Sequence, residues 1–100
     1  MIQILKSDPG GYRFYIKSKS GHSLMVSRTF DTKLQAEAVL RAAQRNPIFE
    51  RKTNHEGNFL IHLKGSDGSK VAESKTYTSE AGMENGIKNV KHCLSQSDGF

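Results

Sequence analysis

The chain has 100 residues, of which 35% are hydrophobic, and a formal net charge of +5 from 15 Lys and Arg against 10 Asp and Glu. This length predicts one domain that buries roughly 60–65% of the surface exposed by the unfolded chain. A single cysteine excludes an internal disulfide and a cysteine-based metal knuckle, and no apolar run is long enough for a membrane helix. Without a basic and then apolar leader, we expect a cytoplasmic location. The positive charge weakly favours an acidic or polyanionic partner.

The first half of the chain predicts three strands. Residues 2–5 form a short apolar strand, and the turn residues 8–11 end it because Pro and Gly do not suit a central strand. Residues 12–17 alternate between apolar and polar side chains, which is typical of a half-buried strand. After a further turn, residues 23–27 return as the partner of that strand in a hairpin.

A helix follows these strands. Thr32 and Gln35 have the spacing of a capping box, in which the hydroxyl accepts from the first turn and the amide reaches back. Asn46-Pro47 ends the helix, since the residue before proline is disfavoured in the helical region. Four apolar residues recur at helical spacing and predict one buried face: Ala36, Val39, Leu40 and Ala43.

The second half repeats this plan. Strands are expected over residues 48–52, 59–64 and 70–74, and Ser79 then caps a helix. Gly86 within that helix predicts a close approach of its backbone to the sheet, because glycine weakens a helix interior by about 1 kcal/mol relative to alanine. The apolar stripe of this helix consists of Met83, Ile87, Val90 and Leu94.

The two halves align without a gap when residues 1–46 are shifted by 47 positions. Six pairs are identical: Gly10/Gly57, Lys17/Lys64, Gly21/Gly68, Ser27/Ser74, Thr29/Thr76 and Glu37/Glu84. Seven further pairs keep their apolar character: Tyr12/Phe59, Phe14/Ile61, Ile16/Leu63, Leu24/Val71, Phe30/Tyr77, Leu40/Ile87 and Ala43/Val90. We therefore interpret 1–47 and 48–94 as repeats within one domain, followed by a flexible tail at 95–100.

These patterns predict an α+β fold built from two tandem β3-α repeats. Strands with one apolar face and helices with one apolar stripe fit a two-layer domain. We expect one mostly antiparallel sheet of about six strands with both helices on one face. The short third strands leave two registers open, with either Leu24 or Met25, and either Val71 or Ala72, facing the core.

Several motifs resemble the YegP-like family of small bacterial proteins without an assigned function. The second half carries them most clearly, in 57–64, Ser66-Asp67-Gly68, Ser74-Lys75-Thr76-Tyr77 and 86–91. The first half departs from the pattern, with Phe30 in place of the tyrosine and 39–43 in place of the glycine-containing helix motif. The resemblance implies paired β3-α units in a continuous sheet, with strands that can be exchanged between units. It implies no reaction.

No catalytic, cofactor or metal site is predicted, and we expect a protein that is not an enzyme. The histidines lack the close spacing of metal ligands and are interpreted as surface residues: His22, His55, His62 and His92. Cys93 is interpreted as a packed, inert thiol rather than a reactive one, although Lys91 and His92 precede it. Ser27 and Ser74 recur in both halves, which suits a structural role better than a single nucleophile.

The candidate functional surface is the sheet face opposite the helices. Strand alternation places six residues there: Arg13, Tyr15, Lys17, Leu60, His62 and Lys64. An uncovered face of this kind favours an interaction or structural module that binds a protein partner or a second copy. Basic residues between rings also suit nucleic-acid binding, in which rings stack on bases and cations meet phosphates. The interaction module is the first hypothesis and nucleic-acid binding is the alternative.

Overall fold

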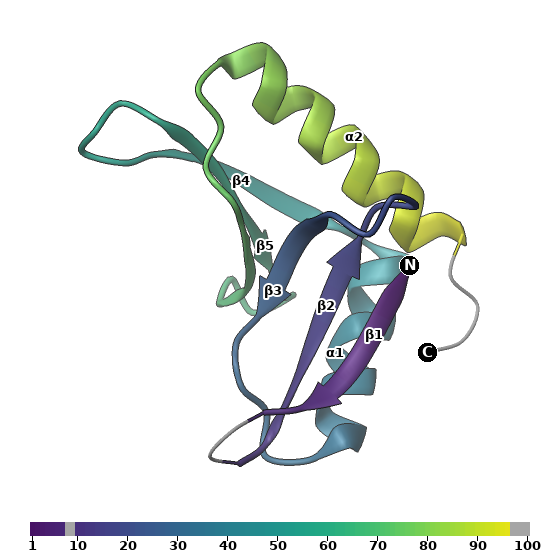
Figure 1. The fold of residues 1–100 in the computed structure, drawn as a ribbon. Helices are drawn as coiled ribbons and strands as arrows, with labels where there is room; N and C mark the ends of the chain where they lie inside the picture. Colours follow the sequence, from purple (N-terminus) through teal and green to yellow (C-terminus); the bar gives the residue numbers. More distant parts are fainter. Residues whose placement is uncertain (8–9, 97–100) are drawn as a thin grey trace.

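The computed structural model describes residues 1–7 and 10–96. The strands form one sheet in the order β1-β2-β3-β6-β5-β4, with antiparallel neighbours throughout. The elements are β1 (Ile2–Lys6), β2 (Tyr12–Lys17), β3 (Ser23–Ser27), α1 (Lys33–Arg45), β4 (Ile48–Thr53), β5 (Phe59–Lys64), β6 (Lys70–Ser74) and α2 (Glu80–Gln96). Figure 1 shows the sheet in front of α1, which lies behind β1 and β2. The predicted α+β class is confirmed. Asp8 and Pro9, from the first predicted turn, lie outside the described residues.

The elements recur at the spacing found in the sequence. Strands β2 and β5 begin and end 47 residues apart, and so do β3 and β6. Each half keeps its own three strands together, and the halves meet where β3 pairs with β6. Four core residues on β2 and β5 are fully buried: Phe14, Ile16, Ile61 and Leu63. Both helix stripes join these residues in one hydrophobic cluster, so the helices cover the same face.

The third strands bury both of the residues between which the sequence left a choice. Leu24 and Met25 are 5% and 1% exposed, and Val71 and Ala72 are 3% and 2% exposed. The physical reason is a register shift in the ladders of β2 with β3 and of β5 with β6, just after Ile16 and Leu63 respectively. A bulge of this kind interrupts strict alternation.

Serine hydroxyls complete both ladders at the end opposite the shift. Ser27 Oγ accepts from the Phe14 N–H at 2.9 Å and donates to the Arg28 carbonyl at 2.7 Å. Ser74 Oγ accepts from the Ile61 N–H at 2.8 Å and donates to the Lys75 carbonyl at 2.7 Å. The serines therefore satisfy buried backbone groups that would otherwise lack partners.

Both helices begin at the predicted caps. Thr32 Oγ1 accepts from the Gln35 N–H at 3.1 Å, and Gln35 Oε1 accepts from the Asp31 N–H, one residue before the cap. Ser79 Oγ accepts from the Gly82 N–H at 3.0 Å. α1 has 13 residues and α2 has 17.

The second helix also extends past the expected repeat boundary. α2 includes Ser95 and Gln96, which the sequence assigned to the tail, and 97–100 lie outside the described residues. Between residues 10 and 96 and in 1–7, neither helix is long and apolar enough to span a bilayer.

The close approach expected at Gly86 is made by Tyr77, which follows β6. A Cβ atom at Gly86 would lie 2.3 Å from Tyr77 Oη and 2.7 Å from Tyr77 Cζ. Burial raises the pKa of Tyr77, and its hydroxyl has no hydrogen-bond partner among the residues that the structure describes. The glycine therefore provides the space for the tyrosine ring, and the helix can lie against it.

Candidate functional site

One row of side chains crosses the whole sheet on the face opposite the helices, which we call the open face. Each residue is the register partner of the next: Gln3, Tyr15, Val26, Glu73, His62 and Glu50. The first three come from one half and the last three from the other, at equivalent positions 47 residues apart. The half from β1 to β3 thus presents uncharged groups in this row, whereas the half from β4 to β6 presents two carboxylates and an imidazole.

His62 lies between the two carboxylates. Its Nε2 is 3.0 Å from Glu73 Oε1 and its Nδ1 is 3.8 Å from Glu50 Oε1. Its side chain is 16% exposed, so it differs from the plain surface histidine expected from the sequence. Because both ring nitrogens face carboxylates, the ring is held in place rather than presented to a partner.

Lysines complete this network on the second half. Lys64 Nζ is 3.1 Å from Glu50 Oε1, and Lys52 Nζ is 3.4 Å from the same oxygen. The hydrogen bond from Lys64 is the main cause that lowers the pKa of Glu50, against a smaller desolvation effect. Lys70 Nζ is 3.4 Å from Glu73 Oε1. The predicted surface residue Leu60 is the register partner of Lys52 and lies beside this network.

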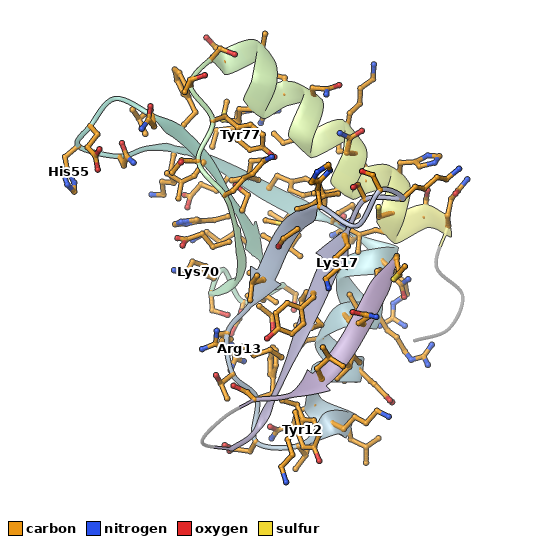
Figure 2. The ribbon with its side chains drawn as sticks, in the orientation of Figure 1. Tyr12, Arg13, Lys17, His55, Lys70 and Tyr77 are labelled. Carbon is orange, nitrogen blue, oxygen red and sulfur yellow. The ribbon has the colours of Figure 1, made fainter. Side chains whose placement is uncertain are left out.

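The first half of the open face has no such network. Arg13 Nε donates to the Thr29 hydroxyl at 3.0 Å rather than to a carboxylate. Among the residues that the structure describes, neither Arg13 nor Lys17 forms an ion pair. Tyr15 and Val26 are half-buried, and Leu5, the register partner of Arg13, is 48% exposed. Figure 2 shows Arg13 and Lys17 along β2.

A groove of about 420 Å³ runs over the pairing of β3 with β6 on the open face, and we call it the seam groove. Four cationic residues and one carboxylate are among its lining residues: Arg13, Arg28, Lys70, Lys75 and Glu73. The lining also includes equivalent residues of the two halves in pairs, namely Ser23/Lys70, Val26/Glu73, Ser27/Ser74 and Arg28/Lys75. The groove therefore lies where the two halves meet.

The sequence identified Arg13 but not the other groove residues. Arg28 and Lys75 follow the third strands, whose register the sequence left open, and Lys70 begins β6. The carboxylates of Glu50 and Glu73 were also missed. The alternation of side chains along 48–52 and 70–74 could have placed these carboxylates on the open face, but a bulge disturbs the alternation in the third strand.

Other candidate groups form no recognisable reaction centre. Cys93 Sγ donates to the Lys17 carbonyl at 3.4 Å and lies 3.8 Å from the Met1 amino group. His22 Nδ1 is 2.9 Å from Ser20 Oγ in a turn. Over 1–7 and 10–96, no group of three or more His, Cys, Asp or Glu side chains has a metal-binding arrangement.

Comparison with known proteins agrees with the resemblance seen in the sequence. A family profile described as a domain of unknown function, DUF1508, matches residues 54–97. A UPF0339 protein of Pseudomonas aeruginosa is 29% identical over 100 residues, covering 96% of this chain and 91% of the relative. YegP of Escherichia coli K12, also a UPF0339 protein, is 27% identical over 94 residues, covering 90% and 86%.

Two solved structures share the fold. The solution structure of Escherichia coli YegP matches with a TM-score of 0.82 and 25% identity, covering 96% of this chain and 86% of the other. The solution structure of a UPF0339 protein from Shewanella oneidensis gives a TM-score of 0.86 at 23% identity, with the same coverage. The resemblance of this chain to the YegP-like proteins, the UPF0339 proteins of bacteria whose function is not established, is therefore confirmed in sequence and in fold.

Proposed function

We propose that this chain is a non-catalytic binding protein that uses the first half of the open face as its contact surface. The observation that carries the proposal is the contrast between the halves of that face. Tyr15, Val26 and Leu5 present apolar area next to two cations, while the second half binds its own charges in a network. Apolar area bordered by polar groups is typical of a protein contact surface.

The contacts of the side chains that could act as nucleophiles or bases support a non-catalytic role. A nucleophile requires a base within hydrogen-bond reach and donors for the developing charge. Ser27 and Ser74 instead bond backbone groups, and His62 bonds carboxylates. Cys93 is a thiol and not part of a disulfide, which is compatible with a reducing compartment, and we propose the cytoplasm as the place of action.

Affinity capture with matched surface variants tests this proposal. Leu5→Gln and Tyr15→Gln change the open face, whereas Leu34→Gln changes an exposed leucine of α1 that is 77% accessible. We expect the wild type and Leu34→Gln to retain the same bacterial proteins, or the same oligomer in light scattering. The two open-face variants should lose them while keeping the circular dichroism spectrum of the wild type. Equal capture by all four proteins would contradict the proposal.

Nucleic-acid binding is the second candidate, and the seam groove favours it. Its lining residues carry four positive charges against one carboxylate. Nuclease treatment before capture separates the two candidates, because partners tethered through nucleic acid are lost and direct protein partners remain.

A further inference from the structure

We propose that the seam groove binds single-stranded nucleic acid, with a phosphate on three cations at one end of the groove and a base on the ring of Tyr15. We call Arg13, Arg28 and Lys70 the cation cluster. This inference rests on the proposed function only in using the open face as the contact surface. It adds the chemical class of the partner and the residues that recognise it.

Backbone pairing brings the cation cluster together from β2, from the residue after β3 and from β6. The Arg28 N–H donates to the Val71 carbonyl at 2.8 Å, which places Arg28 next to Lys70 across the seam. Arg13 Nε donates to the hydroxyl of Thr29, the residue after Arg28. Arg28 and Lys70 are exposed and Arg13 is half-buried. Figure 2 shows Arg13 and Lys70 on neighbouring parts of the sheet.

The carboxylates near the cluster already have partners. Glu73 bonds His62 and Lys70. Asp67 accepts from the Ser69 hydroxyl and N–H, and these two bonds are the main causes that lower its pKa, with a smaller contribution from Arg28. Against these two carboxylates the cluster has three cations, so a net positive charge remains at this end of the groove, and Lys70 exchanges Glu73 for the phosphate on binding. Such an excess attracts anions, and the attraction falls with ionic strength.

The opposite end of the groove makes a polymer a better occupant than one small anion. Lys75 is the equivalent of Arg28 in the second half and lines the other end. Val26 and Glu73 are register partners, and Arg28 and Lys75 lie two residues beyond them in opposite directions. Four residue steps along antiparallel strands separate Arg28 and Lys75 by about 13 Å. A strand with several phosphates can contact both ends at once.

An aromatic ring next to the groove favours a single strand over a duplex. Tyr15 is the register partner of Val26, which lines the groove floor. Rings on an open sheet stack with unpaired bases, and this contact tolerates any base because each has a π face. An acidic peptide would use the cation cluster without requiring the ring.

Fluorescence anisotropy with labelled single-stranded DNA of mixed sequence tests the proposal. We expect binding at low salt and a steep loss of affinity as salt rises. The double variant Arg13→Gln, Lys70→Gln should reduce the slope of log K against log salt by up to about 0.7, since the cation cluster contacts one phosphate and each phosphate contact of a single strand contributes about 0.7. Tyr15→Leu keeps the apolar volume but removes the stacking surface, and should weaken binding by about fivefold to a hundredfold.

A control of equal charge makes the result specific. Lys33→Gln, Lys88→Gln removes two positive charges from exposed helix positions and should leave the salt slope unchanged. Equal loss of affinity in both double variants would overturn the site, as would the absence of binding at low salt. Tighter binding of duplex DNA or of polyglutamate than of the single strand would also overturn it. If nucleic-acid binding fails while the open-face variants still lose captured proteins, only this inference is overturned and the proposed function stands.

Discussion

The two halves of this chain share a framework but differ on the surface that the framework presents. In each half a serine repairs the ladder, and in each half a cation after the third strand lies over an aromatic ring. Arg28 Cζ is 4.2 Å from the Phe30 ring centroid, and Lys75 Nζ is 5.5 Å from that of Tyr77. By contrast, the row across the open face is uncharged in one half and forms an ion-pair network in the other.

This difference separates positions that hold the fold from positions free to acquire a function. The framework residues satisfy buried backbone groups or fill the core, so a change there has a direct cost in stability. Open-face residues contact solvent, and substitutions there usually change stability little. A contact surface could therefore develop on the uncharged half, whereas the charged side chains of the other half pair with one another.

The helices differ in a related way. Tyr77 of the second half faces Gly86, whereas their equivalents in the first half are Phe30 and Val39. The half that has tyrosine at the ring position thus has glycine at the facing helix position. The ring and the helix position have to be considered as a pair.

Truncation of equivalent core leucine and isoleucine side chains should have the largest effect. Leu40 and Ile87 occupy equivalent buried positions on α1 and α2, in one hydrophobic cluster. Leu40→Ala and Ile87→Ala should each lower the free energy of unfolding by about 2–5 kcal/mol. Urea denaturation should show one transition with an unchanged m-value in both variants, because the halves share their core. Two separate transitions would show that the halves fold independently, and Ile87→Val provides a milder variant should Ile87→Ala not fold.

The framework could be predicted because its signals are local. Alternation over 12–17 and 59–64, helical spacing, and the caps at Thr32 and Ser79 each depend on a few neighbouring residues, and each is found in the structure. The end of α2 differed by two residues, since a polar terminal turn gives no stop signal.

The site was less predictable because it depends on pairing between distant strands. The seam groove exists only where β3 meets β6, and neither strand indicates its partner. The carboxylate of Glu50 reaches Lys64 across a ladder whose register the sequence does not state. The contact between Tyr77 and Gly86 could be predicted only in part, since the sequence indicated a close approach at Gly86 but not that Tyr77 makes it.

Substitution at Gly86 should have the next largest effect and sharpens the comparison of the helices. Gly86→Ala places a methyl group against the Tyr77 ring and should destabilise the protein by about 1–3 kcal/mol, although alanine is normally the better helix former. Tyr77→Phe removes a buried hydroxyl that has no hydrogen-bond partner within 1–7 and 10–96, and should be neutral or stabilising. The double variant should recover part of the lost stability, because it lacks the hydroxyl oxygen. The recovery should be incomplete, because Cζ remains 2.7 Å from the new methyl group. Thermal unfolding of the four proteins measures the coupling.

Gly82 provides the control for this cycle. A Cβ atom there would lie 3.1 Å from Ser79 Oγ and 3.7 Å from Tyr77 Cδ1, so the clash is much milder. Gly82→Ala should therefore cost clearly less than Gly86→Ala. Equal losses at the two positions would mean that contact with the tyrosine ring does not determine the effect.

A smaller effect is expected when the second half of the open face is made to resemble the first. Glu73 carries the only carboxylate that lines the seam groove within the described residues. Glu73→Gln removes that charge and should strengthen the binding of single-stranded DNA by about two- to fivefold at low salt. Glu37→Gln, an equal charge change on α1, should leave the affinity unchanged. If both substitutions strengthen binding equally, net charge attracts the nucleic acid and the groove has no special role.

The smallest expected effect concerns an ion pair that only the second half possesses. Arg51 of β4 contacts Glu84 of α2 through two bonds of 2.5 and 2.9 Å, whereas the equivalents in the first half are Ile4 and Glu37. The hydrogen bond from Arg51 lowers the pKa of Glu84.

A carboxyl group with a lowered pKa in the folded state stabilises the fold above its unfolded pKa of about 4.3, and this contribution is lost as the pH falls through the folded value. Melting temperatures should thus be slightly lower for Glu84→Gln than for the wild type near neutral pH, and the difference should vanish in acid. Both side chains are about half exposed, so the effect is small and should decrease with added salt. Glu37→Gln should show no such pH dependence, and a matching dependence in that variant would mean that the Arg51 contact does not stabilise the second half.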